Sequence, residues 1–178
     1  MAGKGKRVAR RAEAVILFAV ASNTFAIAAT AVDEIRNMDG LKPLSHSPLA
    51  YSRLARVRHQ LMREGKTYFV VDAGFHFCML PSKATRVLVL RNSSTAVLVD
   101  RIDRMAEINA IYALPRAFTG EERRWYRGLA LMSVSGRGEP EDIVPIVNPD
   151  AFLGVAEQQM LQAFVQPAKS PAKGAASA

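Results

Sequence analysis

An internal repeat constrains the fold of this 178-residue chain more than any other feature of its sequence. Residues 16–35 contain two short apolar runs around a polar turn, followed by a segment in which apolar and charged residues alternate. Residues 87–105 repeat this plan, and a shift of 71 residues aligns the two hairpin segments. Two apolar runs around a short polar turn predict a β-hairpin, so the chain contains two copies of one hairpin plan.

A second pair of segments follows the first pair in the same order. Gly65 leads into residues 69–72, and Gly128 leads, after a longer loop, into residues 145–148 at a shift of 76. Two pairs in the same order indicate a domain that is built twice on one plan. Short strands with turn signals between them are typical of small barrels or a sandwich.

The first apolar segment also imitates a secretory signal. In residues 4–31, basic residues precede an apolar run and small residues follow it. A turn at residues 21–24, with polar residues at 22–24, interrupts the run, whereas a membrane span needs about 20 mainly apolar residues without such a break. The second copy of the hairpin favours a folded segment, so we expect residues 15–29 to belong to the domain. A cleaved signal or a membrane anchor on an exported β-domain is the alternative.

The remaining segments fit a mainly β domain that ends in a short helix. Residues 56–62 and 125–133 have the composition of strands. Residues 150–164 carry apolar residues at helical spacing, with Asp150 as the expected cap. Connecting loops are predicted at residues 40–48, 114–122 and 135–142, the last of them mobile.

The positive charge is concentrated at the two ends of the chain. The net charge is +8, yet residues 1–11 carry five basic residues and residues 167–178 carry two more, while all 16 acidic residues lie between these ends. A phosphate-binding surface needs a basic face, which the nearly neutral middle does not favour. We predict disordered tails at residues 1–12 and 165–178 around one domain at 13–164, with weak tethering of the tails to anionic lipid or nucleic acid as the alternative.

The polar residues of the sequence do not form a recognisable catalytic or metal-binding motif. His46, His59 and His76 lack metal-type spacing, and His76 and Cys78 would share a strand face without further ligands. The only cysteine, Cys78, lies in an apolar run and is expected to be buried; one cysteine also fits a reducing compartment. No nucleophile–base pair is evident, so the sequence favours a binding protein without metal or cofactor over an enzyme.

Several short strings resemble those of the CheW-like domain family of chemotaxis coupling proteins, over residues 14–153. Their order and spacing together carry the resemblance. They are Val32-Asp33-Glu34-Ile35, Glu64-Gly65 before residues 69–72, the segment 96–102, Tyr126-Arg127-Gly128, and the segment 143–148.

The resemblance implies an all-β fold of two intertwined five-stranded SH3-like barrels, here with the short C-terminal helix. It also implies a non-catalytic, cofactor-free cytoplasmic scaffold at receptor arrays on the inner membrane face, without membrane insertion. The implied partners are the regulatory domain of a CheA-type histidine kinase and the cytoplasmic tip of a methyl-accepting chemoreceptor. A small β-barrel that binds nucleic acid is the alternative function.

The resemblance further implies a partner-binding surface. The residues that it assigns to this surface are Val32, Glu34, Ile35, Glu64, Gly65 and Arg127. Val32 could equally be a core residue and Glu34 a solvated one, while Gly65 and Gly128 could serve backbone conformation or packing. The chain has Glu64-Gly65 where the family has Arg-Gly, with Arg63 one place early, and has Phe69 for a proline. These departures predict an altered partner surface on an unchanged fold.

Overall fold

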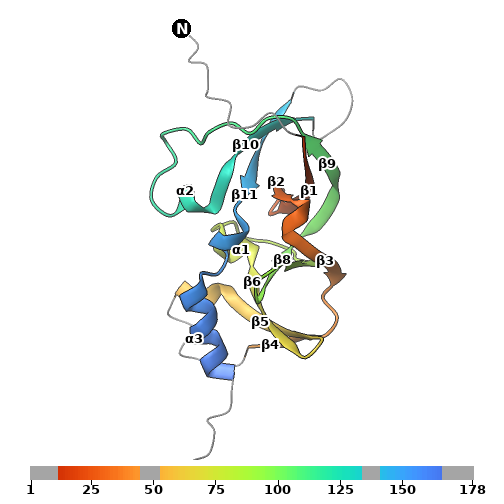
Figure 1. Cartoon of the computed structure of the whole chain (residues 1–178), viewed down its shortest axis with the longest axis vertical. Helices are drawn as coiled ribbons and strands as arrows, with labels where there is room; N and C mark the ends of the chain where they lie inside the picture. Colours follow the sequence, from red (N-terminus) through yellow and green to blue (C-terminus); the bar gives the residue numbers. More distant parts are fainter. Residues whose placement is uncertain (1–11, 45–52, 134–140, 166–178) are drawn as a thin grey trace, which may run out of the picture.

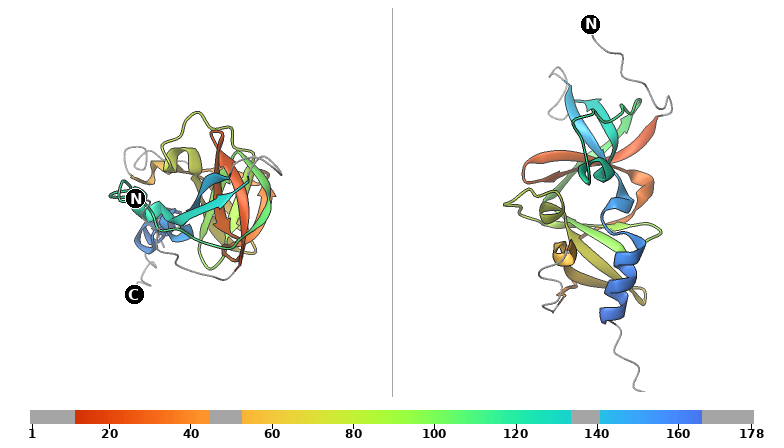
Figure 2. Two further views of the ribbon diagram at one scale, coloured as in Figure 1. Left: turned by 90° about the horizontal axis from the view of Figure 1, so that it is seen from above. Right: turned by 90° about the vertical axis from the view of Figure 1, so that its left-hand side faces the viewer.

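The computed structural model describes residues 12–44, 53–133 and 141–165, and in these residues the strands form two mixed sheets. The predictions for the two tails, and most of those for the loops at 40–48 and 135–142, lie outside the described residues. Figure 1 shows one sheet above the other, and Figure 2 shows the same stack from the side.

The first sheet has five strands in the order β10-β11-β2-β1-β9. Their bounds are β1 (Glu13–Val20), β2 (Asn23–Ala28), β9 (Arg101–Ile108), β10 (Tyr126–Met132) and β11 (Asp142–Val147). The second sheet has six strands in the order β3-β7-β8-β6-β5-β4. Their bounds are β3 (Val32–Asn37), β4 (Leu41–Pro43), β5 (Val57–Arg63), β6 (Lys66–Asp72), β7 (Arg86–Leu90) and β8 (Thr95–Val99).

Six short helical segments join or flank the strands in the described part of the chain. The α-helices are α1 (Ala73–His76), α2 (Glu122–Trp125) and α3 (Val155–Val165), and the 3-10 helices are η1 (Ala29–Ala31), η3 (Arg53–Arg56) and η4 (Pro149–Ala151). The helix α3 runs along the second sheet, in the lower half of Figures 1 and 2. Among the described residues, no helix combines the length and the apolar character that crossing a bilayer requires.

The two copies of the repeat exchange their third strands. Strand β3 follows the first hairpin in the chain but pairs with β7 of the second copy, and β9 follows the second hairpin but pairs with β1 of the first. Apart from the added β4, both sheets have the same order of equivalent strands, and in each a parallel pair, β11 with β2 or β6 with β8, joins the halves. The predicted intertwined, mainly β fold with a short C-terminal helix is therefore confirmed.

The central strands are apolar along most of their length because both of their faces are buried there. In β1, Val15 and Leu17 face a cluster inside the first sheet, while Ile16, Phe18 and Val20 face a cluster shared with the second sheet. A strand buried on both faces is a continuous apolar run without polar alternation. This double burial explains why residues 15–29 look like a secretory signal, and the predicted hairpin there is confirmed as β1 and β2.

The register of the repeat differs from the prediction. The parallel pair Ile146↔Ala26 is equivalent to Val70↔Ala96, which relates β2 to β8 by 70 residues instead of 71. From this pair to the tip, the first hairpin needs residues 18–25, whereas the second needs only residues 90–95. The first hairpin is therefore longer. A shift of one residue exchanges the two faces of a strand, so the sequence alignment placed residues on the wrong face.

The apolar run after β6 turns instead of continuing as a strand. The side chain of Asp72 accepts a hydrogen bond from the Phe75 backbone N–H and caps the four-residue helix α1. His76 is buried among Phe77, Trp125 and Phe152, whereas Cys78 is exposed and has a φ of +56°. The predictions that Cys78 is buried and shares a strand face with His76 are therefore wrong.

The C-terminal helix begins later than predicted. Residues 149–151 form η4, where the Asn148 side chain accepts a hydrogen bond from the Asp150 backbone N–H, so Asp150 is not the cap. The helix α3 begins at Val155, and the Glu157 carboxylate accepts a hydrogen bond from the Gly154 N–H at 2.9 Å. Likewise, the strand predicted from residue 125 begins at Tyr126, because Trp125 belongs to α2.

Candidate functional site: the exchanged strand β3 and the β5–β6 turn

Strand β3 lies at one end of the second sheet and carries three of the predicted partner-binding residues. Val32 is buried and belongs to the core shared by both sheets. Ile35 is 42% exposed, a large value for an isoleucine in a strand. The pairing with β7 is irregular between Val32 and Glu34, so Asp33 is an additional residue in the strand. Such a bulge turns neighbouring side chains away from strict alternation.

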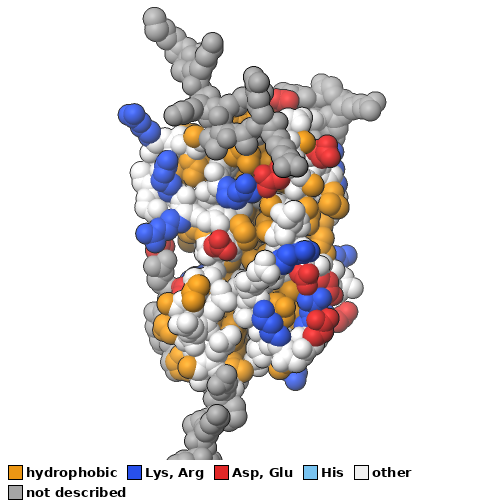
Figure 3. All heavy atoms as spheres, in the orientation of Figure 1, with side chains coloured by type: hydrophobic (Ala, Val, Ile, Leu, Met, Phe, Trp, Pro, Cys, Tyr) orange, Lys and Arg blue, Asp and Glu red, His pale blue; other side chains and the backbone are white. Residues whose placement is uncertain are grey.

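The bulge brings both Asp33 and Glu34 to one arginine on β5. Arg63 Nη1 lies 2.6 Å from Asp33 Oδ2, and Arg63 Nε lies 2.9 Å from Glu34 Oε2. Arg91 adds a second cation 3.7 Å from Asp33. The hydrogen bond with Asp33, followed by that with Tyr68, raises the pKa of Arg63 above its ordinary value. Acidic and basic side chains gather in this region, on the lower right of Figure 3.

The turn between β5 and β6 places Glu64 beside this network. Arg63 and Lys66 are the last pair of the two strands, and the two residues between them have φ values of +49° and +75°. Positive φ at both central positions is the type I′ geometry, which favours glycine at the second position. Gly65 therefore serves backbone conformation. The Glu64 side chain is 80% exposed and its carboxylate lies 3.7 Å from Arg63 Nη2.

Arg127 does not join this group, because it lies on β10 of the first sheet. Its guanidinium donates to both carboxylate oxygens of Glu13, at 2.6 and 3.3 Å. Its neighbour Gly128 has a packing role, since a Cβ there would lie 2.5 Å from the Tyr112 backbone oxygen. The structure thus places Glu34 and Glu64 beside Arg63, keeps Val32 in the core and Ile35 exposed on the same strand, and leaves Arg127 on the other sheet.

Sequence reasoning missed the residues at the centre of this surface, namely Asp33, Arg63 and Arg91. Strict alternation along β3 would have directed Asp33 to the opposite face from Glu34, and only the bulge overrides it. Arg63 was visible as the arginine one place early in the altered Arg-Gly motif, and that displacement was the available signal.

Strand β3 offers an exposed apolar side chain, Ile35, and its bulge holds a mixed group of charges. Ile35 can bury apolar area against a partner, and the carboxylates and arginines can exchange their mutual ion pairs for pairs across an interface. Among the residues that the structure describes, no three His, Cys, Asp or Glu side chains are placed to hold a metal ion.

Comparison with known proteins gives a family for the chain. The family model of the CheW-like domain matches residues 14–157. The scaffolding protein TtCheW from Thermoanaerobacter tengcongensis has a similar fold, with a TM-score of 0.63 and 13% identity over 88% of this chain and 98% of that one. No curated protein matches the sequence. Since the family model covers most of the chain, this protein is a member of the CheW-like domain family.

Proposed function

We propose that the protein is a non-catalytic scaffold that couples chemoreceptors to a CheA-type histidine kinase. Membership of the CheW-like family and the similarity in fold to a CheW scaffolding protein support this role. In this proposal the protein acts in the cytoplasm, at receptor arrays, on the regulatory domain of the kinase and the cytoplasmic tip of the receptor.

The observation that carries the proposal is the surface formed by β3 and the β5–β6 turn. It combines Ile35 as an apolar contact with the network of Asp33, Glu34 and Arg63. Protein interfaces typically combine apolar side chains, which supply affinity, with charges, which orient the partner and set specificity. Strand β3 also ends the order of its sheet, so a partner can approach it from the side.

The structure gives little support to nucleic-acid binding as the alternative. Five of the described arginines are held by carboxylates: Arg56 by Glu157, Arg63 by Asp33 and Glu34, Arg91 by Asp33, Arg101 by Asp103 and Arg127 by Glu13. A phosphate-binding face depends on cations that are free to replace counterions along the backbone. The paired arginines therefore favour the protein-binding role.

Reversing the charge of Glu34 tests the assigned surface. In the Glu34→Arg variant, Arg63 loses one partner and a second cation stands beside it. We expect affinity for the kinase regulatory domain or the receptor tip to fall about ten-fold or more, which corresponds to about 1.4 kcal/mol. Isothermal titration calorimetry with each purified partner measures this change. Because Glu34 is only partly buried, we expect stability to change by less than about 1 kcal/mol.

Glu107→Arg is the matched control, since Glu107 is an exposed acid on β9 of the first sheet. It makes the same charge change away from β3 and should leave both affinities within about two-fold. Equal affinities for Glu34→Arg and the unchanged protein would show that this surface does not contact either partner. Equal losses in both variants would mean that net charge, and not the site, determines binding.

A further inference from the structure

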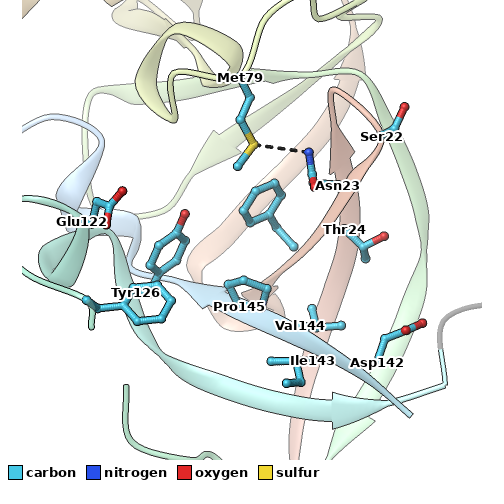
Figure 4. Close-up of a pocket in the computed structure, with 12 residues that line it drawn as sticks. Ser22, Asn23, Thr24, Met79, Glu122, Tyr126, Asp142, Ile143, Val144 and Pro145 are labelled. Atoms are coloured by element: carbon cyan, nitrogen blue, oxygen red, sulfur yellow. Dashed lines mark hydrogen bonds between the residues drawn. The ribbon is translucent and has the colours of Figure 1, made fainter. Parts of the chain in front are cut away.

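The first sheet contains an open cleft between β2 and β11. Its cavity volume is about 600 Å³, and it is bordered by Ser22–Phe25 of the first hairpin, Asp142–Pro145 of β11, Met79, Phe118, Glu122 and Tyr126. Figure 4 shows Asn23 and Met79 on one side, Glu122 and Tyr126 opposite, and Ile143 to Pro145 below. Burial, together with the Glu122 carboxylate, raises the pKa of Tyr126 to about 12.

Pro145 explains why the two strands separate at this point. Strands β2 and β11 form a single registered pair, Ile146↔Ala26, whereas the equivalent strands of the second sheet, β8 and β6, form four. In the second sheet, the Phe69 N–H donates to the Ser94 carbonyl at 2.8 Å. The equivalent of Phe69 is Pro145, which has no N–H to donate, so the ladder cannot continue toward Thr24.

A helix occupies the equivalent position in the second sheet. Gln162 and Val165 of α3 border the same place there, next to Lys66, Thr67, Phe69 and Ser94, and leave a hollow of only about 300 Å³. Gln158 Oε1 of α3 accepts a hydrogen bond from the Ser94 backbone N–H at 3.1 Å, and Leu161 is fully buried in the shared core. The fold therefore already seats a helix, anchored by Leu161, on one of its two equivalent clefts.

The cleft of the first sheet differs from its counterpart in charge. The residue equivalent to Lys66 at the border of the cleft is Asp142, and Glu122 adds a second carboxylate. In the second sheet, the Lys66 amine donates to the Ser93 carbonyl at 2.6 Å, beside a helix that carries no basic residue. A helix seated in the first cleft would instead meet two acids. No element in the described part of the chain covers this cleft.

We propose that the cleft between β2 and β11 binds an amphipathic helix of a partner protein, as the equivalent cleft of the second sheet holds α3. The partner helix would carry a lysine or arginine that lies beside Asp142 and Glu122. The apolar face of that helix would pack on Phe118, Ile143 and Pro145, which keep accessible surface at the cleft. Laying an amphipathic helix into an apolar groove is a common mode of recognition. The site lies apart from β3 and does not depend on the coupling role.

Synthetic peptides that carry the sequence of α3 test the proposal. The probe is a peptide of residues 153–165 with a hydrocarbon staple between positions 159 and 163, which are both exposed in α3, and with Gln162→Lys. Position 162 is chosen because Gln162 lies beside Lys66, the equivalent of Asp142. Titration into the full-length protein, followed by amide chemical shifts, should show saturable binding with the largest shifts at Thr24, Ile143 and Tyr126.

Charge exchange supplies the controls. A Gln162→Glu peptide should bind at least about three-fold more weakly, the difference expected for an exposed charge pair. In an Asp142→Lys protein this preference should reverse. The proposal is overturned if no peptide binds saturably, if the shifts concentrate at Ser94 and α3, or if Asp142→Lys leaves the preference unchanged. If the unsubstituted α3 peptide bound as tightly as the Gln162→Lys peptide, the occupant of the cleft would be α3 of a second copy of this chain. That result would also overturn the proposal.

Discussion

A glycine at residue 128 permits a close crossing of two chain segments. Leu129 and Tyr112 exchange two backbone hydrogen bonds, at 2.8 and 2.9 Å, just beside it. A Cβ at position 128 would lie 2.5 Å from both the Tyr112 carbonyl oxygen and the Ile111 side chain. Because one of these contacts is backbone, the clash cannot be relieved by a rotamer change alone.

We expect Gly128→Ala to reduce the free energy of unfolding by about 1–3 kcal/mol, since inserting one methyl group into a packed region forces the backbone to shift. Urea denaturation followed by circular dichroism measures the change. Gly154→Ala is the matched control: its nearest contact would be a flexible Glu157 carboxylate at 3.8 Å, so a change below about 0.5 kcal/mol is expected. Equal costs for the two variants would contradict the packing role.

At the scale of residues, the sequence predicted a partner-binding surface on β3 and the β5–β6 turn, and the structure adds neighbours that the sequence did not indicate. Val32 and Glu34 are neighbours of the same strand, yet one is core and the other pairs with Arg63. The bulge at Asp33 comes from the register with β7, a strand more than 50 residues away, and local sequence carries no signal for it. The burial of Cys78 was also mispredicted. The Asp72 side chain caps a short helix, so the apolar run does not continue as a strand and Cys78 is exposed.

At the scale of elements, α3 is fixed to the second sheet by both polar and apolar contacts. Arg56 pairs with Glu157 at 2.9 Å and donates to the Phe152 carbonyl at 3.0 Å. Gln158 accepts from the Ser94 N–H, and Leu161 is fully buried. An isolated helix of this length is marginal in water, so these tertiary contacts hold it.

Leu161→Ala should therefore destabilise the protein by about 2–5 kcal/mol and detach the helix, because it leaves a cavity in the shared core. Hydrogen exchange should become faster at the Ser94 amide, which α3 protects. Met160→Ala changes the adjacent side chain, which is 53% exposed, and should cost less than about 1 kcal/mol with unchanged exchange at Ser94. Unchanged exchange in Leu161→Ala would show that α3 is not held through this residue.

The strand pairs were predictable from the sequence because turn residues and apolar runs are local signals. Both repeated hairpins formed where expected, and the segment predicted at 69–72 is the second half of β6. The register between the two copies was not predictable. The two hairpins differ in length, and an alignment without a gap cannot match both of their strands. The start of α3 was also misplaced, because Pro149 and Asn148 make a separate 3-10 turn first.

At the scale of the whole molecule, the exchange of β3 and β9 joins the two sheets. Neither sheet can separate from the other without breaking the β3–β7 or the β1–β9 ladder, and the cluster around Phe18, Phe25 and Phe69 is common to both. The repeat in the sequence predicted two similar halves. The exchange followed only from the family resemblance, because strand pairing across the repeat leaves no local pattern.

The proposed coupling role belongs to this scale, since a scaffold must hold two partners at once. The shared core of the two sheets keeps surfaces on both halves at a fixed separation, so in this proposal one bound partner would position the other. A membrane co-sedimentation assay measures this property directly, with receptor-containing membranes, a purified CheA-type kinase and the full-length protein.

We predict that the kinase sediments with the membranes in the presence of this protein, in a saturable manner, and that Glu34→Arg reduces the sedimented fraction while Glu107→Arg does not. Sedimentation of the kinase to the same extent with and without the protein, while the protein itself stays in the supernatant, would contradict the coupling role and leave only the fold.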